Sequence, residues 1–159
     1  MNAPVVTAQE LVSLLARRRA RGARVVWTNG CFDLLHVGHI RYLQAARALG
    51  DILIVGVNSD ASVQGLLKGP GRPVTPDNQR MEVLSALSCV DYVIKFEEPN
   101  PLRLIETIQP DILVKGGDWP VEQIVGRHSV EARGGRVVTI PLVPEVSTSG
   151  LIARIKQAG

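Results

Sequence analysis

The sequence has few cysteines, few aromatic residues and little excess charge. Its two cysteines, Cys31 and Cys89, are too few for a disulfide framework and lack the spacing of a metal site. Aromatic residues make up 4% of the chain, which disfavours platforms for stacking the bases of single strands. The 18 basic and 15 acidic side chains leave a formal charge of +3, an excess too small to indicate a nucleic-acid partner.

Long apolar runs and targeting signals are also missing. No apolar stretch is long enough to cross a bilayer, and residues 1–9 lack the basic and then apolar pattern of a signal peptide. We therefore expect a cytoplasmic protein that does not act at a membrane. The 159 residues fit one domain, with an N-terminal helix in residues 1–23 and the main body of the fold in residues 24–155.

Strand and helix patterns alternate along the chain. The run DILIVGV at 51–57 is almost entirely apolar, as expected of a central parallel strand that is buried on both faces. Similar but shorter patterns predict strands at 24–28, 91–95, 111–115 and 136–140. Helices are predicted at 7–21, 37–49, 102–108 and 121–133, with shorter or later ones starting near residues 60, 76 and 147. This order predicts an α/β fold: a doubly wound, Rossmann-like parallel sheet of five strands with helices on both faces.

Some helix ends carry recognisable capping residues. Thr7 and Glu10 form a capping-box pattern, and Gly50 is expected to close the helix at 37–49. Thr75 is expected to cap the following helix, with Pro76 in its first position. In doubly wound sheets, ligands bind beyond the carboxyl ends of the strands, so the segments 29–39, 58–72, 116–119 and 141–149 should carry the chemistry.

Two histidines follow the first strand. His36 and His39 are three residues apart at a helix start and share one face, with Gly38 between them. A helix start offers free N–H groups and the positive end of a dipole, both suited to phosphate. The imidazoles can donate hydrogen bonds to phosphoryl oxygens and stabilise charge on a departing pyrophosphate.

Other chemistries fit this segment less well. Zinc needs a third ligand at a plausible spacing, and His128 is distant in a polar stretch. The dinucleotide fingerprint G-x-G-x-x-G does not follow the first strand, which disfavours an oxidoreductase.

The run GCFDLLHVGH at 30–39 resembles the signature of the cytidylyltransferase-like nucleotidyltransferases, whose H-x-G-H motif matches residues 36–39. The longer run is similar to the branch that contains glycerol-phosphate cytidylyltransferase and the heptose-phosphate adenylyltransferases. The resemblance extends from about residue 24 to residue 155. It implies one nucleotidyltransferase domain over residues 1–159, with residues 24–155 as its catalytic core.

Further segments agree with this resemblance. The hydroxyl-rich helix start at 146–149 is similar to the signature that grips the β- and γ-phosphates, whereas capping alone explains only one of its three hydroxyls. The resemblance assigns Lys68 to the α-phosphate, and Arg72 is a candidate ligand for the acceptor phosphate. Arg80 matches a basic position of the relatives. The run KGGDW at 115–119 is typical of the heptose-phosphate enzymes, although a turn with an anchoring tryptophan would fit the residues as well.

One departure separates the branches. The cytidylyltransferase relatives have an arginine shortly before the hydroxyl-rich signature, and residues 141–145 contain none. This favours adenine over cytosine and implies transfer of AMP from ATP to heptose 1-phosphate, giving ADP-heptose and pyrophosphate for the lipopolysaccharide core. The alternative is a cytidylyltransferase for a polyol phosphate such as glycerol 3-phosphate. A regulatory module without catalysis is disfavoured, because the histidines, Lys68 and the hydroxyls are all present.

The predicted site contains residues with three different roles. The catalytic residues are His36, His39 and Lys68. The nucleotide-binding residues are Asn29, Gly30, Cys31, Phe32, Gly38, Lys115, Gly116, Asp118, Val146, Ser147, Thr148 and Ser149. The residues that bind the acceptor substrate are Asp33, Arg72, Arg80 and Trp119. The resemblance implies Mg²⁺ bound with ATP, without a cluster of protein ligands. It also suggests a form without the sugar kinase domain to which this activity is often fused, and we expect a homodimer.

Overall fold

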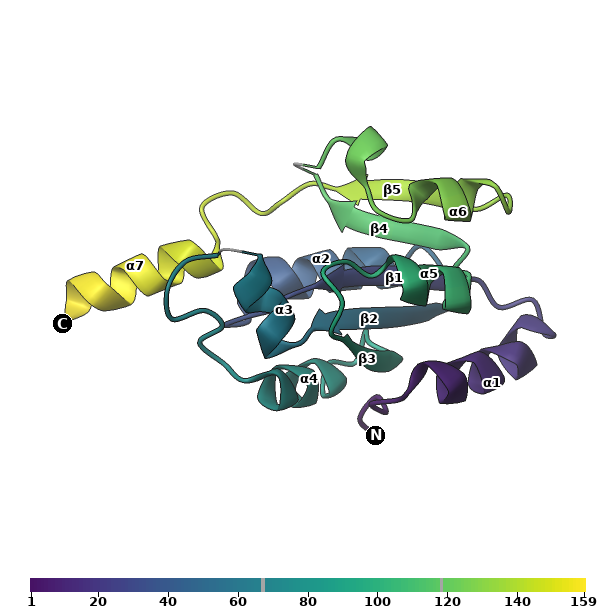
Figure 1. Cartoon of the computed structure of the whole chain (residues 1–159), viewed down its shortest axis with the longest axis horizontal. Helices are drawn as coiled ribbons and strands as arrows, with labels where there is room; N and C mark the ends of the chain where they lie inside the picture. The colour runs from purple at the N-terminus through teal and green to yellow at the C-terminus, as the bar shows by residue number, and fades with distance from the viewer. Residues whose placement is uncertain (67, 118) are drawn as a thin grey trace.

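The computed structural model describes residues 1–66, 68–117 and 119–159. Its centre is a parallel sheet in the order β3-β2-β1-β4-β5 (Figure 1). The strands are β1 Val25–Gly30, β2 Ile52–Asn58, β3 Tyr92–Phe96, β4 Ile112–Gly116 and β5 Arg136–Ile140. The predicted doubly wound fold with five strands is therefore confirmed.

Most helices lie between successive strands, and the first and the last stand at the two ends of the chain. They are α1 Ala8–Arg19, α2 Val37–Arg47, α3 Asp60–Gly65, α4 Asp77–Ser85, α5 Leu102–Ile108, α6 Arg127–Glu131 and α7 Thr148–Ala158, with a 3-10 turn at Val121–Gln123. The capping box of Thr7 and Glu10 at the start of α1 is present as predicted. Within the described residues, no helix has both the length and the apolar character needed to cross a membrane.

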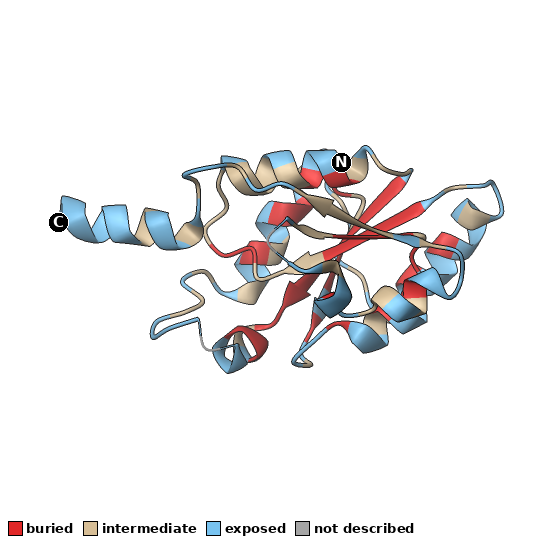
Figure 2. Cartoon of the chain, turned by 90° about the horizontal axis from the view of Figure 1, so that it is seen from above, coloured by how far each residue is buried: buried red, intermediate tan, exposed pale blue. Residues whose placement is uncertain are grey.

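The core has two layers, one on each face of the sheet, and Figure 2 shows buried residues in the strands and in the helices beside them. Val25 and Trp27 of β1 pack with residues of α1 and α5 on one face of the sheet. Val26 of β1 faces the other layer, where it packs with Leu43 of α2 and Leu84 of α4. All seven residues of β2 are buried, because helices cover both faces of this strand.

The strand order reverses between β1 and β4. β1 pairs with β2 as far as Gly30↔Val57, but its pairing with β4 ends at Thr28↔Val114. The last residues of β1 and β4 therefore leave an opening at the carboxyl edge of the sheet. This is the place where doubly wound sheets bind ligands.

Three local predictions were wrong. α4 begins at Asp77 with Pro76 as its N-cap and has no side-chain cap; Thr75 lies one residue too early to cap it, and its backbone N–H donates to Asp33. The stretch 121–133 is not one helix: Gly126, with φ of 88°, separates the 3-10 turn from α6. α2 ends at Ala48 in a right-handed conformation, so Gly50 does not close it. A Cβ on Gly50 would lie 2.7 Å from Val26 Cγ2, which explains a glycine here by close packing.

The last helix, α7, extends away from the sheet (Figures 1 and 2). None of its residues is buried. Its first turn, however, lies beside the opening between β1 and β4. The helix therefore contributes its N-terminus to the site rather than a face to the core.

Candidate active site

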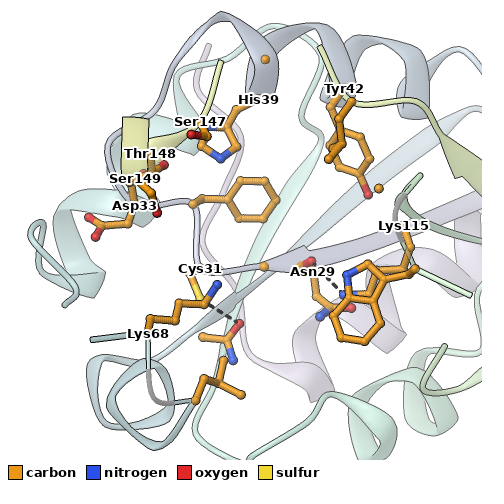
Figure 3. A pocket seen from close by; sticks show the side chains of 18 of the residues that line it. Asn29, Cys31, Asp33, His39, Tyr42, Lys68, Lys115, Ser147, Thr148 and Ser149 are labelled. Carbon is orange, nitrogen blue, oxygen red and sulfur yellow. Dashed lines mark hydrogen bonds between the residues drawn. The ribbon is translucent and has the colours of Figure 1, made fainter. Parts of the chain in front are cut away.

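A cavity of about 700 Å³ lies at the carboxyl edge of the sheet, where the strand order reverses (Figure 3). It is lined by residues from every segment that the sequence singled out: the turn after β1, the segment after β2, the end of β4 and the stretch between β5 and α7. Of the predicted site residues that the structure describes, all except Arg80 line this cavity. Asp118 lies outside the described residues.

The two signature histidines lie against each other. The rings of His36 and His39 stack with their centroids 3.9 Å apart and an interplanar angle of 25°. Nδ1 of His36 accepts from the backbone N–H of Gly38 at 3.1 Å, and Nδ1 of His39 accepts from the backbone N–H of His36 at 3.3 Å. Each ring therefore caps the start of α2 while its second nitrogen is left for a ligand.

These contacts fix the chemistry of the two rings. Because both Nδ1 atoms accept hydrogen bonds, the proton of each neutral imidazole is on Nε2, which is then a donor. Burial lowers the pKa of His39 to about 4, helped by neighbouring His36, and burial also lowers the pKa of His36. At neutral pH the pair therefore presents two uncharged N–H donors rather than general bases.

Gly38, which the sequence placed among the nucleotide-binding residues, has a packing reason to be glycine. A Cβ at this position would lie 2.9 Å from both Cε1 and Nδ1 of His36. The ring of His36 thus occupies the space that a side chain would take. The turn before it is also unusual, because Phe32 and Leu34 both have left-handed backbone conformations, with φ of 50° and 48°. Such conformations in residues other than glycine cost about 1–2 kcal/mol each and often occur at functional sites.

The start of α7 provides the second set of donors. The hydroxyl of Ser147 accepts from the backbone N–H of Gly150 at 3.0 Å and so caps the helix. The hydroxyl of Thr148 donates to the carbonyl oxygen of Asp33 at 2.7 Å, which ties α7 to the turn after β1. Ser149 lines the cavity beside them. Two of the three predicted phosphate-binding hydroxyls therefore also hold the helix start in place.

Asp33 connects the turn after β1 with the loop before α4. Only 2% of its surface is exposed, and its carboxylate accepts from Arg72 Nε at 2.9 Å and from the backbone N–H groups of Val74 and Thr75 at 2.8 and 2.9 Å. These bonds and the Arg72 charge hold the pKa of Asp33 below its usual value, against the opposing effect of burial. In this structure Asp33 therefore positions the loop, and its direct contact with substrate stays a prediction.

Two basic residues of the loop before α4, Lys68 and Arg72, lie in the cavity wall. Lys68 is exposed and lines the cavity close to Cys31 (Figure 3). Arg72 also lines the cavity, but its guanidinium is anchored by the ion pair with Asp33. The loop thus holds one cation anchored by an ion pair, whereas Lys68 forms no ion pair with the described residues.

Arg80 does not line the cavity but stands behind it. Its side chain is 1% exposed and donates to the carbonyl oxygens of Cys31 and Thr75 and to the carboxylate of Asp60. It therefore joins the turn after β1, the loop before α4 and the start of α3. These contacts make Arg80 a positioning residue for the site rather than the direct substrate ligand that the sequence suggested.

The end of β4 forms the opposite wall. Lys115 is partly buried, with Nζ 3.4 Å from the carbonyl oxygen of Asn29 and 5.7 Å from the ring centroid of Trp119. Burial lowers the pKa of Lys115 to about 8. Asn29 accepts from Trp27 Nε1 at 3.1 Å, which fixes its side chain and leaves its amide N–H groups for a ligand. Trp119 is 53% exposed and forms the rim.

Sequence analysis missed several lining residues. Tyr42 lines the cavity, and its hydroxyl donates to the carbonyl oxygen of Val114 at 3.2 Å and lies 2.6 Å from the Thr28 hydroxyl. Burial raises the pKa of Tyr42 to about 12. Tyr42 lies one helical turn after His39, and this spacing places both side chains on the same face of α2, which could have identified Tyr42 from the sequence. Asn58, the last residue of β2, was signalled by its place at a strand end.

The described residues do not form a metal site by themselves. No group of three or more His, Cys, Asp or Glu side chains within the described parts of the chain could hold an ion. Asp33 is the only carboxylate among the described lining residues, and its oxygens already accept three hydrogen bonds. A metal that enters with a nucleotide would therefore be held mainly by phosphate oxygens, the usual situation for Mg²⁺.

Two helix starts and paired imidazole donors converge on one cavity at the switch point, and this arrangement defines a nucleotidyltransferase. Residues 27–154 match the family model described as cytidylyltransferase-like. The chain belongs to this family.

Curated relatives have the same region within longer proteins. Bifunctional protein HldE from Citrifermentans bemidjiense is 58% identical over 145 residues, which cover 91% of this chain and 30% of that protein. The bifunctional protein HldE of Syntrophotalea carbinolica is 56% identical over 147 residues, or 92% of this chain and 30% of that protein. The chain thus spans about 30% of the length of these relatives, and the absence of a kinase domain stays a prediction.

Solved structures agree with the fold. The lipopolysaccharide core biosynthesis protein from Thermoplasma volcanium has a TM-score of 0.64 and 30% sequence identity, covering 77% of this chain and 98% of that one. Pantothenate synthetase from Thermus thermophilus has a TM-score of 0.63 at 21% identity, over 98% of this chain and 70% of that one. The second likeness bears on the fold alone.

Proposed function

We propose that the protein transfers AMP from ATP to D-glycero-β-D-manno-heptose 1-phosphate, giving ADP-heptose and pyrophosphate. An oxygen of the sugar phosphate attacks the α-phosphorus, and the bond from that phosphorus to the bridging oxygen of the β-phosphate breaks. The identity of 58% to a bifunctional HldE protein supports this substrate pair. The relative from Thermoplasma volcanium, named for lipopolysaccharide core biosynthesis, supports the same pathway.

The arrangement of His36 and His39 is the observation that carries the proposal. Neutral Nε2–H donors suit the charge that builds on the pyrophosphate as it leaves. The attacking phosphate oxygen is already anionic at neutral pH, so this reaction needs no general base, and a His39 pKa of about 4 would make that ring a poor one. Catalysis then depends on alignment and on stabilisation of charge.

The triphosphate would bridge the two helix starts. The start of α2 offers the imidazoles, and the start of α7 offers Ser149 together with the hydroxyls of Ser147 and Thr148. We propose that Mg²⁺ enters with ATP on its phosphate oxygens, where it neutralises charge during transfer. Lys68 would add a positive charge near the α-phosphate.

Base selectivity would depend on the stretch between β5 and α7. Leu142 and Val143 line the cavity there, and residues 141–145 contain no arginine that could serve cytosine. We therefore propose ATP rather than CTP as the donor, in the cytoplasm where ATP is available, and a homodimer as the working form. A polyol-phosphate cytidylyltransferase is the alternative.

A substrate panel tests this function. Pyrophosphate release is measured for ATP, CTP, GTP and UTP, each with heptose 1-phosphate, glycerol 3-phosphate and glucose 1-phosphate. ATP with heptose 1-phosphate should give the highest kcat/KM. Equal or better use of CTP with glycerol 3-phosphate would assign the protein to the polyol-phosphate branch. His39→Asn, measured in parallel, shows that the release comes from this site.

A further inference from the structure

The cation at the end of β4 faces the cavity, but the mechanism proposed above does not use it. Lys115 is partly buried, and within the described parts of the chain no carboxylate forms an ion pair with it. Among the described residues, its polar partners are the Asn29 carbonyl oxygen, at a long 3.4 Å, and the face of Trp119. An ammonium group held in a cavity wall by such weak partners is well suited to receive an anionic ligand.

The position of Lys115 separates it from the triphosphate donors. Figure 3 shows Lys115 and Asn29 on one side of the cavity, and His39, Ser147, Thr148 and Ser149 on the other. If the β- and γ-phosphates lie at the helix starts, as proposed above, Lys115 faces them from the other side of the cavity and is not part of that group of donors.

The geometry of displacement gives this side of the cavity a function. In phosphoryl transfer the attacking and leaving oxygens are roughly in line, on opposite sides of the phosphorus. The leaving pyrophosphate is assigned to the helix starts, so the entering phosphate must approach from the side away from them. Lys115 and Lys68 are the two lysines that line the cavity away from the helix starts. Their charges act on each other, and the thiol of Cys31 lies within electrostatic range of both.

We propose that Lys115 forms a second anion subsite, which binds the phosphate monoester of the acceptor rather than the nucleotide. This assignment rests on the proposed function and replaces the nucleotide-binding role that the sequence suggested for Lys115. The Lys115 ammonium lies 5.7 Å from the ring centroid of Trp119, a cation–π contact that helps to hold the lysine at the cavity wall before the acceptor arrives. Arg72, held by Asp33, is then a secondary ligand for the same phosphate.

The experiment uses the full chain saturated with Mg²⁺ and α,β-methylene-ATP. Inorganic phosphate is titrated and its binding followed by ³¹P NMR, while binding of the nucleotide analogue is measured separately by calorimetry. Lys115→Met keeps the length of the side chain and removes the charge, and Lys115→Arg retains it. Lys95→Met is the matched control, because Lys95 lies at the end of β3 outside the cavity.

Lys115→Met should weaken phosphate binding about tenfold or more, as expected for loss of a charged hydrogen-bond donor, and change affinity for the analogue less than about twofold. Lys115→Arg should restore most of the phosphate affinity, and Lys95→Met should change neither. The melting temperature of Lys115→Met should be equal to or above that of the wild type, because a partly buried charge is replaced by an apolar chain.

Three results would overturn the subsite. They are absence of phosphate binding to the wild type, equal loss of both ligands in Lys115→Met, and a lower melting temperature with both ligands weakened, which would indicate a structural lysine. Failure of the proposed function looks different. In that case phosphate binding depends on Lys115, but the wild type transfers no nucleotide to heptose 1-phosphate.

Discussion

Nδ1 of His36 accepts the backbone N–H of Gly38, and the backbone N–H of His36 is in turn donated to Nδ1 of His39. The pair is therefore part of the start of α2. These backbone hydrogen bonds fix the orientation and the tautomer of both rings, and so the direction of the two Nε2–H groups, before any ligand binds. In each ring, the Nδ1 edge holds the helix start in place, and the opposite Nε2–H edge is available to a ligand. Substitutions that preserve one edge at a time can separate the two roles.

Asparagine places its side-chain oxygen near Nδ1, whereas glutamine places its amide near Nε2. We expect His36→Asn and His39→Asn to fold normally and to lose about 10²-fold or more in kcat, as for removal of one donor to developing charge. The corresponding glutamine variants should retain part of the activity. His128→Ala, on the exposed face of α6, is the control. Near-normal turnover in either folded asparagine variant would remove the histidines from the mechanism.

The low pKa of His39 predicts an effect of acid on stability. Its folded-state pKa is about 4 and its usual value is 6.5, so the unfolded chain binds more protons between these values. The contribution of this ring to stability is complete above pH 6.5 and is lost as the pH falls toward 4. Urea unfolding at pH 7.5, 6.5 and 5.5 should show a smaller loss for His39→Gln than for the wild type. Parallel loss in both proteins would mean that His39 titrates normally.

The two loop cations should give different kinetic signatures. Lys68→Ala should lower kcat with little change in ATP affinity, since its contact is made chiefly in the transition state. Arg72→Ala should raise the KM for the sugar phosphate, because its ion pair with Asp33 holds the guanidinium at the cavity before reaction. Steady-state kinetics, with ATP affinity from calorimetry, separate these effects. If Lys68→Ala weakens ATP binding but retains full kcat, Lys68 is only a binding residue.

Replacement of Arg80 should affect both stability and activity. Arg80→Ala leaves the Cys31 and Thr75 carbonyl oxygens without their donor, at a cost of about 1–3 kcal/mol for each acceptor that is left buried. Arg80→Lys should not restore the loss, because one ammonium cannot reach three separated acceptors. Urea unfolding and kcat/KM measure the two effects. Full stability in Arg80→Ala would show that these bonds do not hold the site walls.

Much of the fold could be predicted because its signals are local. The apolar run that became β2 and the capping box of Thr7 and Glu10 each need only a few neighbouring residues. The chemistry of the H-x-G-H segment was also readable, since its spacing places both rings on one helix face.

Roles that depend on distant partners could not be read in this way. Asp33 bonds to groups about 40 residues away, and Arg80 reaches back to Cys31 across a similar separation. The sequence showed neither set of partners, and both residues were expected to bind the acceptor substrate, Arg80 because it matches a basic position of the relatives. The break between Val121–Gln123 and α6 depends on Gly126, which was not recognised as a helix breaker.

The short pairing between β1 and β4 has a mechanical consequence. Three register pairs, from Val26↔Ile112 to Thr28↔Val114, connect the β3-β2-β1 half of the sheet to the β4-β5 half. The helix α2 follows β1, and α7 follows β5. A triphosphate bound to the starts of both helices would therefore link the two halves of the sheet across this short pairing. The enzyme would then become stiffer and harder to melt when loaded, since a ligand that binds only the folded state stabilises it more as its free concentration rises above its Kd.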